Sequence, residues 1–304
     1  MAAAKVNGVR SVDLGVPDPK ASSAFYTDVW GLSQIEERGG SIYLRATGPA
    51  HHVIALHRRE SPALLRVTLT APDRAAIDGL HAAVKQAGVK DIGAPAAVTE
   101  PGGGYGFTFK DPEGRVIRIL TGDARHKDVS EKADVPIKIT HTVLNTPDRV
   151  AATDFYCNVL GFRAVDRTGF MTFLSCNPEH HSLAFAQGKA PTLNHIAFLM
   201  KDLESVMRGA GRLKDKGYAI DWGVGRHGPG NNVFAYWVGP DNVVVEYTSE
   251  VQLIDESYKV GEPKDWVWPP GRMDKWGIAV GPTDRMKAAQ AQLAFAPELF
   301  KPAA

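Results

Sequence analysis

The sequence predicts an α+β protein with two domains, each built from paired βαβββ modules. Two observations carry this prediction. The chain has 304 residues, which at about 100–200 residues per domain is enough for two domains with cores of their own. The chain also repeats itself, and the same order of one strand, one helix and three strands recurs inside each half.

The duplication is clearest where each half begins. Residues 8–18 read GVRSVDLGVPD and residues 138–148 read KITHTVLNTPD. Phe25-Tyr26 recurs 130 positions later as Phe155-Tyr156. Further segments match at offsets of 129 or 128: 49–56 with 178–185, 64–73 with 193–202, and 107–119 with 235–247. We therefore predict an N-terminal domain over 1–130 and a C-terminal domain over 131–304, joined by the polar stretch 122–134.

The second half shows the modules in order. Alternating apolar residues predict a strand at 138–144; Pro147-Asp148 then opens a helix that Gly161 ends, and the stretch 19–32 is its counterpart in the first half. Strands follow near 162–168, 171–175 and 181–186. The next module has a strand at 193–200, a helix at 202–216 ended by Gly217, and strands near 219–224, 233–238 and 242–248.

Two remaining segments have simpler interpretations. Residues 101–105, PGGGY, lack the GK[ST] ending of a phosphate loop and precede a strand, so we predict a hairpin turn. Residues 283–304 predict a short terminal helix with a loose end.

Composition excludes several classes of function. Hydrophobic residues make up 44% of the chain and charged residues 23%, as in ordinary globular proteins. No apolar run reaches the roughly 18–20 residues that cross a membrane, and no secretory signal is readable, so we expect a cytoplasmic protein. Thirty-five basic residues balance thirty-four acidic ones without a dense basic cluster, so no nucleic-acid partner is expected. Cys157 and Cys176 lack CxxC spacing, so we predict neither a disulfide framework nor a thiolate zinc site.

The module order resembles the vicinal oxygen chelate superfamily, the glyoxalase, bleomycin-resistance and dioxygenase fold. The two-domain, four-module layout resembles the type I extradiol ring-cleaving dioxygenases, such as catechol 2,3-dioxygenases and 2,3-dihydroxybiphenyl 1,2-dioxygenases. The resemblance covers about 8 to 280 of the chain. It implies that paired modules wrap a sheet into a half-open barrel around a metal ion.

The resemblance implies His141, His195 and Glu246 as the metal ligands. His141 and His195 lie in the first strands of the third and fourth modules, and Glu246 lies in the last strand of the fourth. Glu246 stands in the apolar run NVVVEYTSE, where an unpaired carboxylate would be costly. Two histidines and one carboxylate leave coordination positions open, which suits Fe(II), with Mn(II) as an alternative. The matching positions of the first half hold Ser11, Arg66 and Arg118, so only the second half is expected to bind metal.

Three further residues match the catalytic pattern of the dioxygenases. His181 precedes a short apolar strand, and the segment GRHGPGNNVFAYWVGPDNVVVEY places His227, Tyr236 and Glu246 at separations of nine and ten. The resemblance implies that His227 and Tyr236 hold and deprotonate the ring hydroxyls. It implies that His181 stabilises charge on oxygen and then acts as an acid. Because His51-His52 repeats the pair His180-His181 in the first half, a structural role for the pair stays open.

Substrate contacts are predicted at Val143, Phe173 and Asn231. Val143 lies two residues beyond His141 on the same strand face, and Phe173 lies eight before His181; both also suit an ordinary core. The loop HGPGNN has Pro229 and Gly230 where the family often has Asn or Asp, so Asn231 or its neighbour Asn232 takes that role. The tail 262–277, rich in Trp and Pro, either covers the pocket or packs as a surface strap.

The sequence thus predicts an Fe(II)-dependent extradiol dioxygenase. It would cleave a small aromatic diol with O₂ to a muconic semialdehyde-type product, and we expect a homo-oligomer. The nearest alternative on this fold is another metal enzyme, either a glyoxalase-like isomerase or a thiol transferase. A binding protein without catalysis is a third possibility, but binding members of the superfamily typically lack the intact triad.

Overall fold

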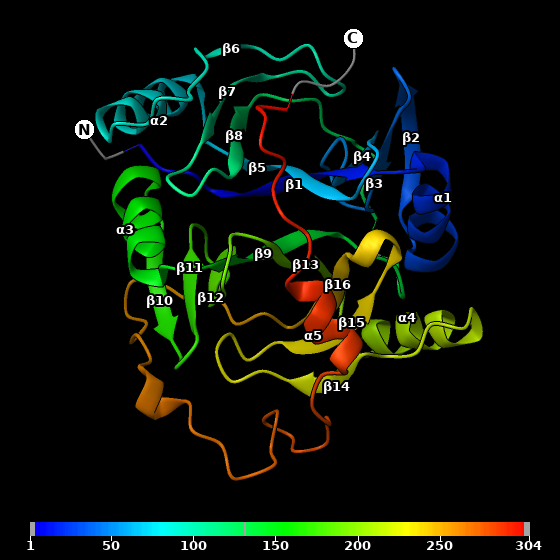
Figure 1. Ribbon diagram of the computed structural model, residues 1–304. Coiled ribbons are helices and arrows are strands. Elements are labelled where there is room, and N and C mark those ends of the chain that lie inside the picture. Colours follow the sequence, from blue (N-terminus) through cyan, green and yellow to red (C-terminus); the bar gives the residue numbers. More distant parts are fainter. Residues whose placement is uncertain (1–3, 131, 301–304) are drawn as a thin grey trace.

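The computed structural model describes residues 4–130 and 132–300, and it consists of two eight-stranded sheets with helices packed around them (Figure 1). The first sheet contains β1 (Gly8–Val16), β2 (Ser33–Arg38), β3 (Ser41–Arg45), β4 (Ile54–Arg58), β5 (Ala63–Thr70), β6 (Ala96–Ala97), β7 (Tyr105–Lys110) and β8 (Val116–Thr121). The second contains β9 (Lys138–Thr146), β10 (Arg163–Arg167), β11 (Met171–Ser175), β12 (Leu183–Gln187), β13 (Leu193–Leu199), β14 (Trp222–Arg226), β15 (Val233–Val238) and β16 (Val244–Ser249).

The two sheets have the same topology, which confirms the duplicated α+β fold. Their strand orders are β2-β3-β4-β1-β5-β8-β7-β6 and β10-β11-β12-β9-β13-β16-β15-β14. In each sheet the first strands of the two modules are antiparallel neighbours at the centre, β1 with β5 and β9 with β13. The last strand of each second module, β8 or β16, runs parallel beside its first strand. This arrangement brings residues from three distant segments of the chain onto adjacent strands.

The helices follow the predicted caps. Helix α3 (Arg149–Leu160) begins after Asp148, whose carboxylate accepts a hydrogen bond from the Ala151 amide, and it ends at Gly161 in the left-handed region with φ 76°. Helices α2 (Arg74–Gln86) and α4 (Leu203–Asp215) serve the second modules of the two halves. The predicted helix over 19–32 differs, because α1 (Pro19–Ala24) passes into a π-helix, η1 (Phe25–Trp30). Its wider turn buries Phe25, Tyr26, Val29 and Trp30 on one side.

The two halves pack against each other, in part through helices, and share one hydrophobic core. Helices α2 and α3, one from each half, lie side by side (Figure 1). Trp30 of the first half stacks on Tyr247 of the second with ring centroids 3.8 Å apart, and Arg115 Nη2 donates to the Asn145 carbonyl at 2.9 Å. The largest cluster of buried apolar residues draws on both halves. A domain boundary at residue 130 therefore divides the repeats but not the core, and it stays a prediction.

The end of the chain differs from the loose end that the sequence predicts. Helix α5 (Asp284–Gln290) covers the second sheet, but the chain then crosses back to the first half (Figure 1). The Leu64 amide donates to the Ala294 carbonyl, and the Ala296 amide donates to the Leu64 carbonyl. The physical reason lies in β5, which pairs with β8 only from Val67 onward and leaves backbone groups near Leu64 without that neighbour. Residues 301–304 lie outside the described part.

Two smaller predictions concern loops and membranes. The segment 101–105 forms the turn between β6 and β7, as predicted, with the Val98 amide donating to the Gly104 carbonyl. Two short 3₁₀ helices, η2 (Pro240–Asn242) and η3 (Pro263–Asp265), complete the elements described. Among the described helices, none has both the length and the apolar character required to cross a membrane.

Candidate metal centre

Three predicted ligands converge at the middle of the second sheet. His141 comes from β9, His195 from β13 and Glu246 from β16. Both His141 Nε2 and His195 Nε2 lie 3.2 Å from Glu246 Oε2, and one ligand atom from each residue lies within 4.8 Å of the others. Within residues 4–130 and 132–300, no other set of three His, Cys, Asp or Glu side chains meets this criterion.

The donor atoms fit a divalent cation. Glu246 Oε1 is buried and has no hydrogen-bond partner among the described residues, so a bound cation would supply the missing partner. His195 Nδ1 lies 2.8 Å from Asn194 Oδ1, and this contact directs Nε2 toward Glu246. Two imidazoles and one carboxylate match the donor set of non-haem iron and manganese sites.

The electrostatics favour an ionised glutamate among neutral histidines. Burial alone would raise the pKa of the Glu246 carboxyl, but hydrogen bonds and charge from His141 and His195 outweigh burial and hold it well below its usual value. Burial lowers the pKa of His195, against the opposing effect of Glu246. A carboxylate with uncharged imidazoles is the protonation state that binds a metal ion.

His181, His227 and Tyr236 surround the triad. The His181 ring lies 4.1 Å from the His141 ring, centroid to centroid. Tyr236 of β15 is the direct cross-strand partner of Glu246 on β16, and the Tyr236 hydroxyl lies 2.9 Å from His227 Nε2. His227 Nε2 is also 3.9 Å from Glu246 Oε1. Since the side chain of His227 is 22% exposed and those of His141 and Glu246 are 2% and 0%, solvent reaches the site on the His227 side.

Burial also sets the protonation of these groups. It lowers the pKa of His227 to about 4 and lowers that of His181 well below its usual value, in the second case with help from His141. Burial and the charge of Glu246 raise the pKa of the Tyr236 hydroxyl well above its usual value. At neutral pH His181 and His227 are therefore neutral, and Tyr236 keeps its proton.

The predicted substrate contacts divide into two groups. Val143 and Phe173 are buried in one small apolar cluster with Val165, and the Phe173 ring lies 5.1 Å from the His181 ring. They thus adjoin the site, and contact with substrate stays a prediction. Asn231 Oδ1 accepts a hydrogen bond from Lys275 Nζ at 2.7 Å, so its side chain is engaged by the tail.

The tail lies against the loop that carries His227. A Cβ atom added to Gly228 would stand 2.7 Å from Trp268 Cζ2 and 3.1 Å from Trp266 Cε3, so only glycine allows these indole rings to approach so closely. Arg226 stacks over Trp276, with its guanidinium carbon 4.9 Å from the ring centroid. The tail therefore supports the loop beside His227, and cover of the pocket by the tail stays a prediction.

The first half replaces the triad with a buried network of charges. Ser11, Arg66 and Arg118 stand at the matching places and are all buried. Arg66 donates from Nη2 to Asp13 Oδ1 at 2.9 Å and from Nη1 to Glu100 Oε1 at 3.0 Å. Arg118 Nη1 lies 2.7 Å from Glu100 Oε2. Guanidinium groups thus occupy the place where the second half collects metal ligands.

This network should make stability depend on acid pH. Burial alone would raise the pKa of Asp13, but Arg66 and His57 outweigh burial and hold it far below its usual value. Because the folded pKa is depressed, the stabilisation is complete above the unfolded pKa of about 3.9 and is lost as pH falls below it. We expect urea unfolding midpoints of the protein and of Asp13→Asn to differ at pH 7 and to converge as pH falls below about 4. A constant gap would contradict this.

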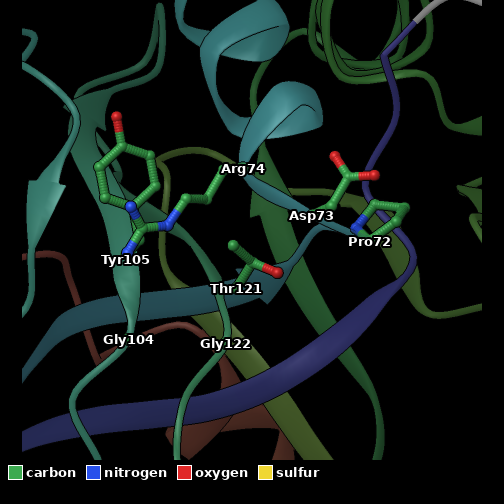
Figure 2. Close-up of a pocket in the computed structure, with 7 residues that line it drawn as sticks. All are labelled: Pro72, Asp73, Arg74, Gly104, Tyr105, Thr121 and Gly122. Carbon is green, nitrogen blue, oxygen red and sulfur yellow. The ribbon is translucent and has the colours of Figure 1, made fainter.

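A surface pocket in the first half is unrelated to the predicted site. It has a volume of about 500 Å³ and is lined by Pro72, Asp73, Arg74, Gly104, Tyr105, Thr121 and Gly122 (Figure 2). The Arg74 guanidinium carbon lies 4.7 Å from the centroid of the Tyr105 ring, so the two side chains form a cation–π contact with each other. None of the predicted site residues lines this pocket.

Sequence reasoning missed Asn194 and Asp166, and it named His180 only as one of a pair whose role stayed open. Asn194 orients His195, and Asp166 and His180 form a hydrogen-bonded chain to His181. The adjacency of Asn194 to His195 was visible, as was the acidic residue shared by both repeats, Glu36 in one and Asp166 in the other. No local pattern links Asp166 to His180, because the contact joins β10 to the loop before β12.

Comparisons with known proteins agree with this geometry. A family model described as the Glyoxalase/Bleomycin resistance protein/Dioxygenase superfamily matches residues 8–119 and 138–247. The chain is 28% identical over 267 residues to a biphenyl-2,3-diol 1,2-dioxygenase of Metapseudomonas furukawaii, covering 81% of this chain and 86% of that one. It is 28% identical over 189 residues to metapyrocatechase 2 of Cupriavidus necator; that match spans 55% of this chain and only 57% of the relative.

Other relatives are named by their metal. An iron-dependent extradiol dioxygenase of Rhodococcus jostii is 28% identical over 179 residues, 50% of this chain and 58% of that one. A manganese-dependent 2,3-dihydroxybiphenyl 1,2-dioxygenase of Geobacillus genomosp. 3 is 34% identical over 87 residues, 28% of each chain.

Solved structures match nearly the whole chain. The Mn(II)-bound glyoxalase from Novosphingobium aromaticivorans is 41% identical with a TM-score of 0.85, covering 92% of this chain and 94% of that one. A homoprotocatechuate 2,3-dioxygenase from Brevibacterium fuscum, 22% identical, shares the fold with a TM-score of 0.80 over 90% of this chain and 80% of that one. The predicted resemblance is thus confirmed: the chain is similar to proteins named as extradiol dioxygenases. The chain belongs to the glyoxalase/bleomycin resistance protein/dioxygenase superfamily.

Proposed function

We propose that the protein is an Fe(II)-dependent extradiol dioxygenase that cleaves a catechol-type ring beside its two hydroxyls, with Mn(II) as the alternative metal. One observation carries the proposal: the open His141, His195 and Glu246 set lies beside a third histidine, His181, and beside the hydrogen-bonded pair His227–Tyr236. Relatives named iron-dependent and manganese-dependent dioxygenases support the metals, and those named for biphenyl-2,3-diol support an aromatic diol with O₂.

His141, His195 and Glu246 would hold the ion through two imidazole nitrogens and a carboxylate oxygen. When bound, the ion would acidify a coordinated hydroxyl and offer neighbouring positions for the diol and O₂. The charge of the Glu246 carboxylate offsets one of the ion's two positive charges, so an anionic substrate oxygen is needed to complete neutralisation. The site is therefore suited to a diol that has lost a proton.

His227 and Tyr236 would orient one hydroxyl of the diol. Both are neutral at pH 7, and at 2.9 Å one of the two donates a hydrogen bond to the other. The partial exposure of the His227 side chain, 22%, supports entry of the substrate on this side of the site. A neutral imidazole there can accept the proton of the first hydroxyl to ionise.

His181 would serve the opposite side of the ring. It is buried, neutral, and in contact with both His141 and Phe173. Once it has accepted a proton, a donor held in such a dry position stabilises charge on oxygen more strongly than one in water. Val143 and Phe173 belong to the apolar cluster next to it and would contact the aromatic face of the diol.

A second candidate is a glyoxalase-type isomerase. It is supported by the 41% identity to a structure named as a Mn(II)-bound glyoxalase. Such chemistry needs a base that moves a proton between carbon atoms, and His181 or His227 would then take that role. It consumes no O₂, which makes the two candidates separable.

Oxygen consumption tests the proposal. The full-length protein, loaded anaerobically with Fe(II) and then mixed in air with catechol, 3-methylcatechol or 2,3-dihydroxybiphenyl, is expected to take up one O₂ per diol and to form a yellow ring-cleavage product. The parallel assay follows isomerisation of a thiohemiacetal formed from methylglyoxal and a thiol. Thiohemiacetal turnover without oxygen uptake on any diol would replace the proposal by the second candidate. A homo-oligomeric state and a cytoplasmic location stay predictions.

A further inference from the structure

A chain of three side chains leads from the sheet edge to the proposed metal site. Asp166 Oδ2 lies 2.8 Å from His180 Nε2, and His180 Nδ1 lies 3.0 Å from His181 Nδ1. Asp166 and His180 are both fully buried, and His181 is 3% exposed. Burying a carboxylate costs free energy unless the charge has hydrogen-bond partners, so the contacts of Asp166 must offset that cost.

The hydrogen atoms along this chain follow from the available donors. The Gly261 amide donates to Asp166 Oδ1 at 2.6 Å, and the Tyr258 hydroxyl donates to Asp166 Oδ2 at 3.0 Å. An ionised carboxylate only accepts, so His180 donates to it from Nε2. With one ring proton, on Nε2, His180 has a bare Nδ1, which accepts a hydrogen bond from His181 Nδ1. With its proton on Nδ1, neutral His181 has a bare Nε2.

We propose that Asp166 and His180 are positioning residues that fix His181 as the Nδ1–H tautomer, so that its bare Nε2 faces the substrate site as a proton acceptor. This inference rests on the proposed function for its catalytic consequence. The O–H bond of the second diol hydroxyl breaks, and its proton forms an N–H bond at His181 Nε2. That same proton is afterwards returned to a product oxygen. The tautomer itself is a property of the protein without substrate.

The C-terminal segment builds this chain. Tyr258 and Gly261 supply two of the three hydrogen bonds to Asp166, and the His180 amide donates to the Gln252 carbonyl. On the other side, a Cβ atom at Gly230 would stand 3.1 Å from His181 Cε1 and 3.2 Å from His180 Nδ1. Gly230 has φ 76°, so glycine there allows the loop after His227 to press on both rings.

The first half carries a matched but weaker version. His51 Nδ1 lies 3.1 Å from His52 Nδ1, so the pair itself belongs to the repeat. Its acid, Glu36, lies 4.0 Å from His51 Nε2 instead of within hydrogen-bond distance. No metal ligands stand beside His52, and its Nε2 is buried without a partner among the described residues. Among the described residues, a histidine pair of this kind has an acid within hydrogen-bond distance only in the second half.

The substitution Asp166→Asn tests the proposal by reversing the chain. The amide oxygen can still accept from Gly261, but the amide nitrogen donates to His180 Nε2. His180 must then carry its proton on Nδ1 and donate to His181, whose own proton moves to Nε2. The readout is the ¹⁵N chemical shift of the His181 ring nitrogens, which separates bare from protonated nitrogen. It is measured on the full-length chain, both metal-free and loaded with diamagnetic Zn(II).

We expect Nδ1–H in the unmodified chain and Nε2–H in Asp166→Asn, in both forms. Controls are Tyr258→Phe, which removes a hydrogen bond but keeps the carboxylate, and Glu36→Gln, the counterpart in the first half; neither should move the His181 tautomer. A His181 that carries its proton on Nε2 in the unmodified chain, or one that Asp166→Asn does not change, overturns the proposal.

The catalytic consequence is measured separately. With the Fe(II)-loaded protein we expect Asp166→Asn to lower kcat on the order of 10- to 100-fold, as loss of an orienting partner does elsewhere, with little change in KM and unchanged iron content. Failure of all diols to consume O₂ would reject the proposed function and leave the tautomer result standing. A normal kcat in a variant whose tautomer is reversed would reject the role of His181 as acceptor.

Discussion

Replacing His141 by alanine is expected to abolish metal retention while the chain stays folded. His141 offers one of the three proposed ligand atoms, which lie within 4.8 Å of one another, and the other two alone would not enclose an ion. Loss of a direct ligand should lower metal affinity by more than the roughly 10- to 100-fold that is lost when a residue hydrogen-bonded to a ligand is removed. Metal content after dialysis against a weak chelator, measured by elemental analysis, checks the result.

The repeat provides a matched control for this variant. Ser11 occupies the position of His141 in the first half, is buried as deeply, and stands on the equivalent strand β1. Ser11→Ala should leave metal content and oxygen uptake unchanged. If the two variants lose metal alike, the ion does not sit between His141, His195 and Glu246; if neither loses it, His141 is not a ligand.

Replacing Arg66 by alanine is expected to destabilise the protein by about 3–5 kcal/mol, the typical cost of removing one member of a buried ion pair. Arg66 is 1% exposed and hydrogen-bonds both Asp13 and Glu100. Its removal leaves one carboxylate fully buried and a second mostly buried without their shared cation. The free energy of unfolding by urea, measured on the full-length chain, gives the loss.

Arg208→Ala is the control for the loss of a guanidinium group as such. Arg208 pairs with Glu204 one turn away on α4, and both side chains are largely exposed. Its loss should cost no more than about 0.5 kcal/mol, because water screens such pairs. Equal effects of the two variants would show that the first-half network contributes nothing beyond a surface ion pair.

Much of the fold and the triad could be predicted because strands repeat with period two and the chain is duplicated. Matching 8–18 with 138–148 aligned the central strands, and the spacing of ten between Tyr236 and Glu246 fitted two neighbouring strands joined by a short turn. The network of Arg66 with Asp13 and Glu100 could not be predicted. Only the absence of ligands was readable there, since charge pairing depends on which side chains meet inside the sheet.

The terminal segment shows the same limit. Its composition did not reveal whether residues 262–277 cover or strap the molecule, nor that Leu293–Ala296 returns to β5. Both depend on features elsewhere in the chain. One is the start of β5, where backbone groups have no partner on β8, and the other is Gly228, which lies against two tryptophan rings. A segment that completes another element's hydrogen bonds carries no periodic signal of its own.

The sequence by itself determined the duplicated fold, the half that could hold a metal, and the residue types available as ligands. Those properties are encoded in repeats and in strand parity, which are local. Only the tertiary structure decided which hydrogen-bond partners surround the proposed ligands and the histidine beside them. Asn194 contacts His195, while Asp166, held by Tyr258 and Gly261, contacts His180 beside His181. Hydrogen-bond direction depends on every partner around a buried group, and those partners come from segments far apart in the chain.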